Sequence, residues 1–309
     1  MSASRDRNIG SRVGNHIGHY IGRFAPSPTG FLHAGSLVAA VASYLDARAH
    51  HGTWLVRMED VDRARTVPGA AESILQTLAA FGMESDGEIV WQSTRSDLYA
   101  AAVQKLGDLI YPCGCSRREI ADSNRHVAVE VKVAQPYPGI CRHGMAPGKT
   151  VRALRIRVPQ LGESNECIRF DDRFCGAVTQ HLSTDVGDFV LRRADNFWAY
   201  QLAVVVDDAA QSVTHVVRGM DLLDSTPRQI YLQRWLNLPT PRYLHVPLLL
   251  DTSGRKLSKQ DGAIPLEHHD VHQQLVAAAS VLGLEITPGN SLKRFWQEAI
   301  AKWAARYSL

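Results

Sequence analysis

The chain has 309 residues, of which 45% are hydrophobic and 21% are charged, and its formal net charge is +3. These values exclude a polyelectrolyte that binds nucleic acid through bulk charge, although a local basic face is compatible with them. No apolar run approaches the ~20 residues that a membrane-spanning helix needs, so we expect a soluble, cytoplasmic monomer without a membrane partner. The size suits one large core or two closely packed lobes.

The start of the chain predicts an extension and then an α/β unit. Residues 1–19 are polar and contain no apolar run of the ~7–15 residues that a secretory signal requires, so we expect a disordered extension. Residues 20–24 predict a strand and 25–30 a turn rich in Pro and Gly. A helix should follow, with an apolar stripe from Leu37 to Leu45 and a C-terminal cap at Gly52.

The next segments continue this alternation of strands and helices. Residues 53–58 predict a strand, and a second helix should open at Pro68 and end at Gly82. Such a strand–turn–helix–strand–helix order is typical of a parallel sheet with crossover helices. We therefore predict the α/β class, with residues 20–112 forming the first half of a nucleotide-binding domain.

The middle of the chain, 113–188, has a different composition. It is richer in Arg, Pro and Gly, it lacks a clear periodicity, and it holds all five cysteines. We interpret it as an insertion, after which 189–250 complete the catalytic domain. The elements expected beyond it are a helix around 199–206, a strand at 213–218, a helix that begins at 225–227, a strand at 244–250, and, within 251–309, a polar loop and two helices.

The first chemical motif is the turn R-F-A-P-S-P-T-G-F-L-H-A-G-S, from Arg23 to Ser36. The turn leads from a strand to a helix N-terminus, where unpaired N–H groups and the positive end of the helix dipole favour phosphate. His33 can donate to phosphate oxygens, and Gly35 lets a nucleotide base approach the backbone. The alternative is an ordinary βα turn in which His33 only caps the helix.

The second motif is Lys256-Leu257-Ser258-Lys259-Gln260, between two glycines. A mobile cationic loop of this kind can neutralise the charge that builds up on a departing pyrophosphate. The alternative is a solvated basic turn.

The third motif is a cysteine cluster. Cys113, Cys115 and Cys141 can supply three ligands of a tetrahedral zinc site that folds the insertion. His143 is the chemically simplest fourth ligand, and His126 is a more distant one. The alternative is three buried thiols without a metal.

Together, the first two motifs resemble the signature pair of class I aminoacyl-tRNA synthetases. The tetrapeptide that reads HIGH in that family reads His33-Ala34-Gly35-Ser36 here, and the loop that reads KMSKS corresponds to Lys256–Gln260. The run A-P-S-P-T-G-x-L-H-x-G is similar to the glutamyl branch, which can be followed over 20–262. The resemblance implies a Rossmann-like parallel sheet with an inserted zinc-containing subdomain and a short C-terminal helical subdomain.

Only 50 residues follow Lys259, too few for an anticodon-binding domain, so the chain looks like a truncated member of this branch. The resemblance then implies a ligase that activates L-glutamate with ATP and transfers it to the queuosine base of tRNA(Asp). Mg²⁺ should accompany ATP. His33, Gly35, Lys256 and Lys259 would be catalytic, and His33, Gly35 and Lys259 would also hold ATP.

The resemblance also implies the amino-acid pocket. Arg23 and Arg218 would bind carboxylates, Glu59 would hold the α-ammonium group, and Tyr137 would be the fourth zinc ligand. The remaining pocket residues would be Ala25, Ser27 and Tyr200. Taken singly, Arg218 or Glu59 could form a surface ion pair. Their position at the carboxyl ends of predicted strands favours ligand binding instead.

Three other functions remain open. A nucleotidylyltransferase would share the His-x-Gly turn, but such enzymes lack the cysteine cluster and normally carry His where Ser36 stands. A non-catalytic zinc- or RNA-binding module would not need His33, Gly35 and the two lysines intact. An ordinary glutamyl-tRNA synthetase cut short would charge tRNA(Glu).

Overall fold

The structure is a computed structural model that describes residues 19–125, 136–249, 266, 269–287, 289 and 291–309. Residues 1–18 of the predicted extension and the lysine motif at 256–260 lie outside the described residues.

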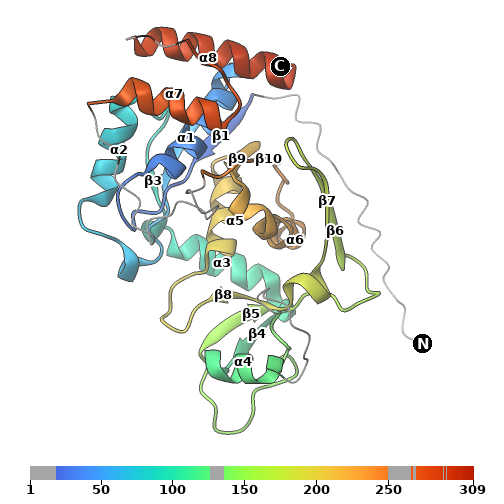
Figure 1. The fold of residues 1–309 in the computed structure, drawn as a ribbon. Coiled ribbons are helices and arrows are strands. Elements are labelled where there is room, and N and C mark those ends of the chain that lie inside the picture. The colour runs from blue at the N-terminus through green and yellow to red at the C-terminus, as the bar shows by residue number, and fades with distance from the viewer. Residues whose placement is uncertain (1–18, 126–135, 250–265, 267–268, 288, 290) are drawn as a thin grey trace.

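Three strands form the first part of a parallel sheet, in the order β1-β2-β3. They are β1 (Ile21–Phe24), β2 (Thr53–Met58) and β3 (Val90–Trp91). The crossover helices are α1 (Ala34–Ala49) and α2 (Ala70–Ala80). This confirms the strand–helix alternation that the sequence predicted for the first half of the catalytic domain (Figure 1).

Four strands form the second part, in the order β7-β6-β10-β9. They are β6 (Cys167–Asp172), β7 (Gly176–His181), β9 (His215–Gly219) and β10 (Arg242–Val246). Strand β10 is parallel to both β6 and β9, whereas β6 and β7 form an antiparallel hairpin. The two parts adjoin at β1 and β9, where the Thr214 N–H donates to the Ile21 carbonyl at 2.9 Å.

A separate antiparallel sheet contains β4 (Ile110–Cys113), β5 (Ala153–Ile156) and β8 (Phe189–Arg192). Together with α4 (Arg117–Arg125) it lies at the end of the molecule opposite α7 and α8 (Figure 1). Its outer strands lie at both borders of the predicted insertion, and β6 from inside 113–188 pairs with β10 of the parallel sheet. The boundaries that the composition suggested for the insertion, 113 and 188, are therefore not the boundaries between the two sheets.

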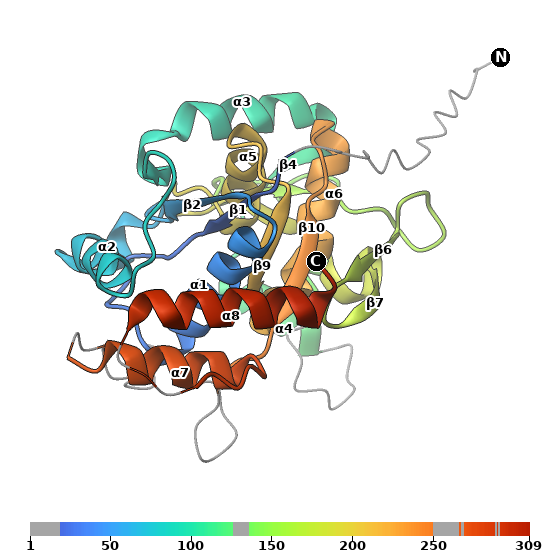
Figure 2. The same cartoon turned by 90° about the horizontal axis from the view of Figure 1, so that it is seen from above.

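Five further α-helices complete the described residues. They are α3 (Ser96–Leu106), α5 (Tyr200–Ala210), α6 (Thr226–Leu236), α7 (Val271–Val281) and α8 (Leu292–Tyr307). Short 3₁₀ segments occur at Arg63–Arg65, Gln92–Thr94, Gly107–Leu109 and Met220–Ser225, and a π-helical turn occurs at Leu182–Val186. Helices α7 and α8 contact α1 and each other (Figure 2). None of the helices in the described residues combines the length and apolarity needed to cross a bilayer.

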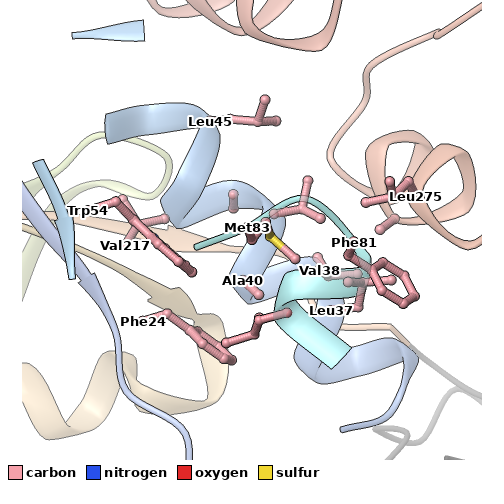
Figure 3. Close-up of a cluster of buried hydrophobic side chains, with 14 of the residues drawn as sticks. Phe24, Leu37, Val38, Ala40, Leu45, Trp54, Phe81, Met83, Val217 and Leu275 are labelled. Carbon is pink, nitrogen blue, oxygen red and sulfur yellow. The ribbon is translucent and has the colours of Figure 1, made fainter. Parts of the chain in front are cut away.

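Two hydrophobic cores lie on the two faces of the parallel sheet. Val217 of β9 points into the core shared with α1, α2, α7 and α8, and its neighbour Val216 points into the core shared with α3, α5 and α6. Figure 3 shows Trp54 of β2 and Leu275 of α7 in the first core. Both faces of the sheet are thus covered, as in other parallel sheets.

Among the predicted strands, the last one differs most in its bounds from the structure. The strand expected at 244–250 is β10, Arg242–Val246. It ends before Pro247, whose nitrogen carries no hydrogen to donate to a neighbouring strand.

Candidate active site

The carboxyl ends of β1, β2 and β9 meet near the start of α1. His33 immediately precedes α1, is 8% exposed, and accepts the Leu37 N–H through its carbonyl at 3.0 Å. Gly35 lies in the first helical turn, where backbone N–H groups have no intrahelical acceptor. This end of α1 therefore offers the anion-binding geometry that the motif predicted.

The turn between β1 and α1 lies beside the end of β2. The Glu59 N–H donates to the Pro26 carbonyl at 2.9 Å, which brings the turn and the strand end together. Ala25 is half-buried and Ser27 is exposed. The structure thus places Ala25, Ser27 and Glu59 at one edge of the sheet.

A buried ion-pair cluster lies beneath this edge. Arg23 donates to both carboxylate oxygens of Asp208, at 3.0 and 3.3 Å. Arg57 has no exposed surface, and it donates to Asp208 at 2.7 Å and to Glu59 at 3.4 Å. The Arg57 side chain also donates to Gln211 at 2.8 Å. Two cations and two anions therefore share the site.

The two carboxylates of this cluster differ in pKa. Burial raises the pKa of Glu59, and the Arg57 and Arg23 cations oppose that rise. Burial also works to raise the pKa of Asp208, but the same two guanidinium groups outweigh it and lower the pKa. Asp208 thus balances the arginines, whereas Glu59, with one long contact to Arg57, keeps acceptor capacity for another cation.

Arg218 of β9 has a different kind of environment. It is 5% exposed, and it donates to Tyr200 Oη at 3.2 Å, Thr226 Oγ1 at 2.8 Å and His245 Nε2 at 3.0 Å. Among the described residues, none of the acidic side chains forms an ion pair with it. A buried guanidinium with neutral partners is suited to bind the carboxylate of a ligand.

The cysteine motif forms a compact cluster. Cys113, Cys115 and Cys141 are buried, and their sulfur atoms all lie within 4.8 Å of one another, with 3.5 Å between those of Cys115 and Cys141. Ligands of a tetrahedral Zn–S site at ~2.3 Å lie about 3.8 Å apart. The three cysteines could therefore hold a metal ion.

Tyr137 also belongs to this cluster. Its hydroxyl lies 3.4 Å from the sulfur atoms of Cys113 and Cys115 and accepts the Cys141 N–H at 2.9 Å. His143 is exposed and is not part of the group that could hold a metal, while His126 lies outside the described residues. The guanidinium of Arg155 covers the Tyr137 ring at 3.8 Å and donates to Cys113 at 3.4 Å.

Residues 21–285 match the family of class I tRNA synthetases (E and Q), catalytic domain. The chain belongs to the class I tRNA synthetases. Glutamyl-Q tRNA(Asp) synthetases from Janthinobacterium sp. (strain Marseille) and Verminephrobacter eiseniae are 62% and 57% identical to this synthetase. These alignments cover 93% and 92% of this chain and 97% of each relative. The synthetase is therefore a ligase.

Solved structures give the same family. A glutamate tRNA ligase from Elizabethkingia meningosepticum, crystallised in complex with its amino acid, has a TM-score of 0.72 and 25% identity. The match covers 92% of this synthetase and 64% of that chain. The glutamate-tRNA synthetase from Elizabethkingia anophelis matches with the same TM-score and identity, over 92% of this chain and 65% of its own.

Sequence reasoning missed several partners in the site of this synthetase. Arg57 is a cation inside a mostly apolar strand, and Asp208 is the second of two acids that follow the apolar run of α5. Charges in such positions indicate buried pairing, so a signal was present. Thr226 and His245 carried no comparable signal, because only the packing of β9, β10 and α6 brings them to Arg218.

Proposed function

We propose that this synthetase activates L-glutamate with ATP as an adenylate and transfers it to the queuosine base in the anticodon of tRNA(Asp). The curated relatives that match over nearly their whole length support the nucleic-acid substrate through their names. The buried Arg218, which pairs with no acid among the described residues, is the observation that carries the amino-acid substrate.

The pocket has groups that match each charge of glutamate. Arg218 and Arg23 would bind the carboxylates, and Glu59 would bind the α-ammonium group. Tyr200, Ala25 and Ser27 would line the rest of the pocket. Because Arg23 already pairs with Asp208, Arg218 contributes the larger share of carboxylate recognition.

The first half-reaction needs no enzyme nucleophile. The glutamate α-carboxylate attacks the α-phosphate of ATP and pyrophosphate leaves, so catalysis depends on positioning and charge stabilisation. His33, Gly35 and the N–H groups at the start of α1 would hold phosphate, with Mg²⁺ accompanying ATP. Lys256 and Lys259, assigned from the sequence motif, would stabilise the departing pyrophosphate.

The cysteine cluster fits one structural Zn²⁺ with Cys113, Cys115, Cys141 and Tyr137 as ligands. Burial is the largest influence on the Cys115 thiol and raises its pKa to about 11, so a bound cation would supply the charge that favours the thiolate. With four protein ligands, the metal would stabilise the fold around β4 and β5 and leave no position for a reacting water.

Two assays test the proposal. Glutamate-dependent exchange of pyrophosphate into ATP without tRNA should be positive, and labelled glutamate should attach to tRNA(Asp) with queuosine but not to the unmodified transcript. Charging of tRNA(Glu) in place of tRNA(Asp) would show an ordinary glutamyl-tRNA synthetase. Absence of exchange with intact folding would overturn the activation step.

A further inference from the structure

A continuous chain of buried polar groups extends behind Arg218. The Nε of Arg218 donates to Nε2 of His245 at 3.0 Å, and Nδ1 of His245 lies 2.7 Å from Oδ2 of Asp172. The side chains of His245 and Asp172 have no exposed surface. The hydrogen bond between His245 and Asp172 is therefore shielded from water, and Arg218 is only 5% exposed.

The hydrogen bonds that join Arg218, His245 and Asp172 allow only one arrangement of protons. The Nε of Arg218 can only donate, so Nε2 of His245 must accept and its single proton lies on Nδ1. Asp172 Oδ2 then accepts that proton's hydrogen bond. Burial lowers the pKa of His245, which favours the neutral ring. Burial would raise the pKa of Asp172, but hydrogen bonds from His245 and from the Cys175 and Phe174 N–H groups lower it to about 2.

The strand pairing holds Arg218 and Asp172, on either side of His245, in place. His245 of β10 is the register partner of Arg218 on β9, and Tyr243 of β10 is the register partner of Asp172 on β6. Asp172 also accepts the N–H groups of Phe174 and Cys175 in the β6–β7 turn, at 3.0 and 2.9 Å. Strand β6 thus brings the carboxylate to His245 from the segment that the sequence marked as an insertion.

The guanidinium of Arg218 is fixed by three bonds. A guanidinium has five N–H groups, and His245, Thr226 and Tyr200 each accept from a different nitrogen. One N–H on each terminal nitrogen remains for a ligand. We propose that Asp172 and His245 are positioning residues for glutamate recognition: they orient Arg218 through its Nε and leave its charge to the substrate carboxylate. This inference rests on the proposed binding of glutamate by Arg218.

The choice of an imidazole follows from electrostatics. A carboxylate in direct contact with Arg218 would compete with the ligand; Arg23, by contrast, already pairs with Asp208. A neutral imidazole accepts the same hydrogen bond without neutralising the cation. Asp172 contacts His245 and not Arg218, and its carboxylate keeps the imidazole proton on Nδ1.

The test compares KM for glutamate with KM for ATP in pyrophosphate exchange. In Asp172→Asn only one oxygen remains for donors on two sides, and when it stays on the Phe174 and Cys175 N–H groups the amide NH2 faces Nδ1 of His245. This orientation favours the other tautomer, whose Nε2–H faces the donor of Arg218. We expect KM for glutamate to rise about tenfold to a hundredfold, the effect of losing one hydrogen bond to a charged group, with KM for ATP unchanged. His245→Leu should behave alike. His245→Gln, whose amide oxygen can stand near the position of Nε2, should recover much of the loss.

A matched control and a direct observation complete the design. Ser43→Ala removes the buried hydrogen bond that Trp54 Nε1 donates to Ser43 Oγ at 3.0 Å, which involves none of the partners of Arg218, His245 or Asp172, and should leave both KM values unchanged. In the wild-type protein labelled with ¹⁵N-histidine, NMR should show His245 as the Nδ1–H tautomer; an Nε2–H or doubly protonated ring would overturn the inference. Wild-type exchange combined with a normal KM for glutamate in Asp172→Asn and His245→Leu would also overturn it. Loss of exchange in the wild type would instead refute the proposed function.

Discussion

At the scale of single residues, the buried arginines differ in how their charge is balanced. Arg23 and Arg57 share Asp208, whereas Arg218 has neutral partners. The sequence placed Arg23 and Arg218 on predicted strands, because strand patterns are local. It could not identify their partners, since the contact between Arg23 and Asp208 joins residues 185 positions apart.

Arg57→Met should destabilise the protein and weaken glutamate binding. The substitution leaves Glu59 without its closest cation, so the pKa of Glu59 should rise further and its negative charge should be lost nearer neutral pH. We expect the free energy of unfolding in urea to fall by about 3–5 kcal/mol, the usual effect of breaking a buried pair. Arg48→Met is the control, because the Arg48 and Asp86 side chains are 24% and 35% exposed, and it should cost less than about 1 kcal/mol. If the two variants lost the same free energy of unfolding, burial would not determine how much each ion pair contributes to stability.

His215 should make stability depend on pH. It stacks on Tyr20 at 4.1 Å between ring centres, and burial lowers its pKa from the usual 6.5 to about 4. Between these values the unfolded chain binds the proton and the folded chain does not, so stability falls as the pH drops from about 6.5 to about 4. His215→Phe keeps the ring contact, and its melting temperature should fall less than that of the wild type over this range. Parallel curves for the two proteins would refute the assignment.

At the scale of elements, the ends of α1 and α2 show what a glycine in the sequence can predict. After α2, Gly82 has φ +74° and Met83 N–H donates to the Leu78 carbonyl, so the predicted helix stop is correct. After α1, the left-handed residue is His51 with φ +51°, and the predicted cap at Gly52 was wrong by one position. Gly52 is required for another reason: a Cβ there would lie 2.5 Å from the Tyr20 carbonyl oxygen.

The middle segment shows the limit of composition as a guide. Its many Arg, Pro and Gly residues predicted a region distinct from the nucleotide fold, and the three clustered cysteines were recognised from their spacing. The pairing of β6 with β10 could not be predicted, because parallel strands are joined by long connections and the pairing partner is not local.

The metal should support this element without taking part in glutamate activation. Elemental analysis should find one zinc per chain, and Cys141→Ser should lose it, because structural sites need all their ligands. Cys175→Ser is the control, since this thiol lies outside the cluster, and it should keep the zinc. Tyr137→Phe tests the fourth ligand.

Loss of zinc should increase hydrogen exchange in β4 and β5 and reduce transfer to tRNA. Pyrophosphate exchange should fall much less, because His33 and Arg218 belong to the parallel sheet. If exchange stopped in a zinc-free protein that remained folded elsewhere, the proposed structural role would be wrong.

At the scale of the whole molecule, one buried carboxylate joins three parts of the chain. Asp46 of α1 accepts from Tyr20 at 2.6 Å, from Arg173 in the β6–β7 turn at 2.7 Å and from Trp303 of α8 at 2.9 Å. Helices α7 and α8 share the core of α1, with no separate core among the described residues. The sequence predicted both helices, but not this packing.

Trp303→Ala should therefore destabilise the whole molecule and not only its C-terminal helices. Trp303 is fully buried, and loss of its ring and its hydrogen bond should lower the free energy of unfolding by about 3–5 kcal/mol. Trp235→Ala is the control, because Trp235 is 46% exposed and should matter little. Side chains of α8 and of the parallel sheet belong to one hydrophobic core, so we expect them to unfold together. Urea unfolding of the wild type, followed by circular dichroism and by fluorescence, should therefore give one coincident transition. Two separate transitions in Trp303→Ala, with glutamate-dependent exchange surviving the first, would mean that α7 and α8 unfold on their own and that the core shared with α1 is not cooperative.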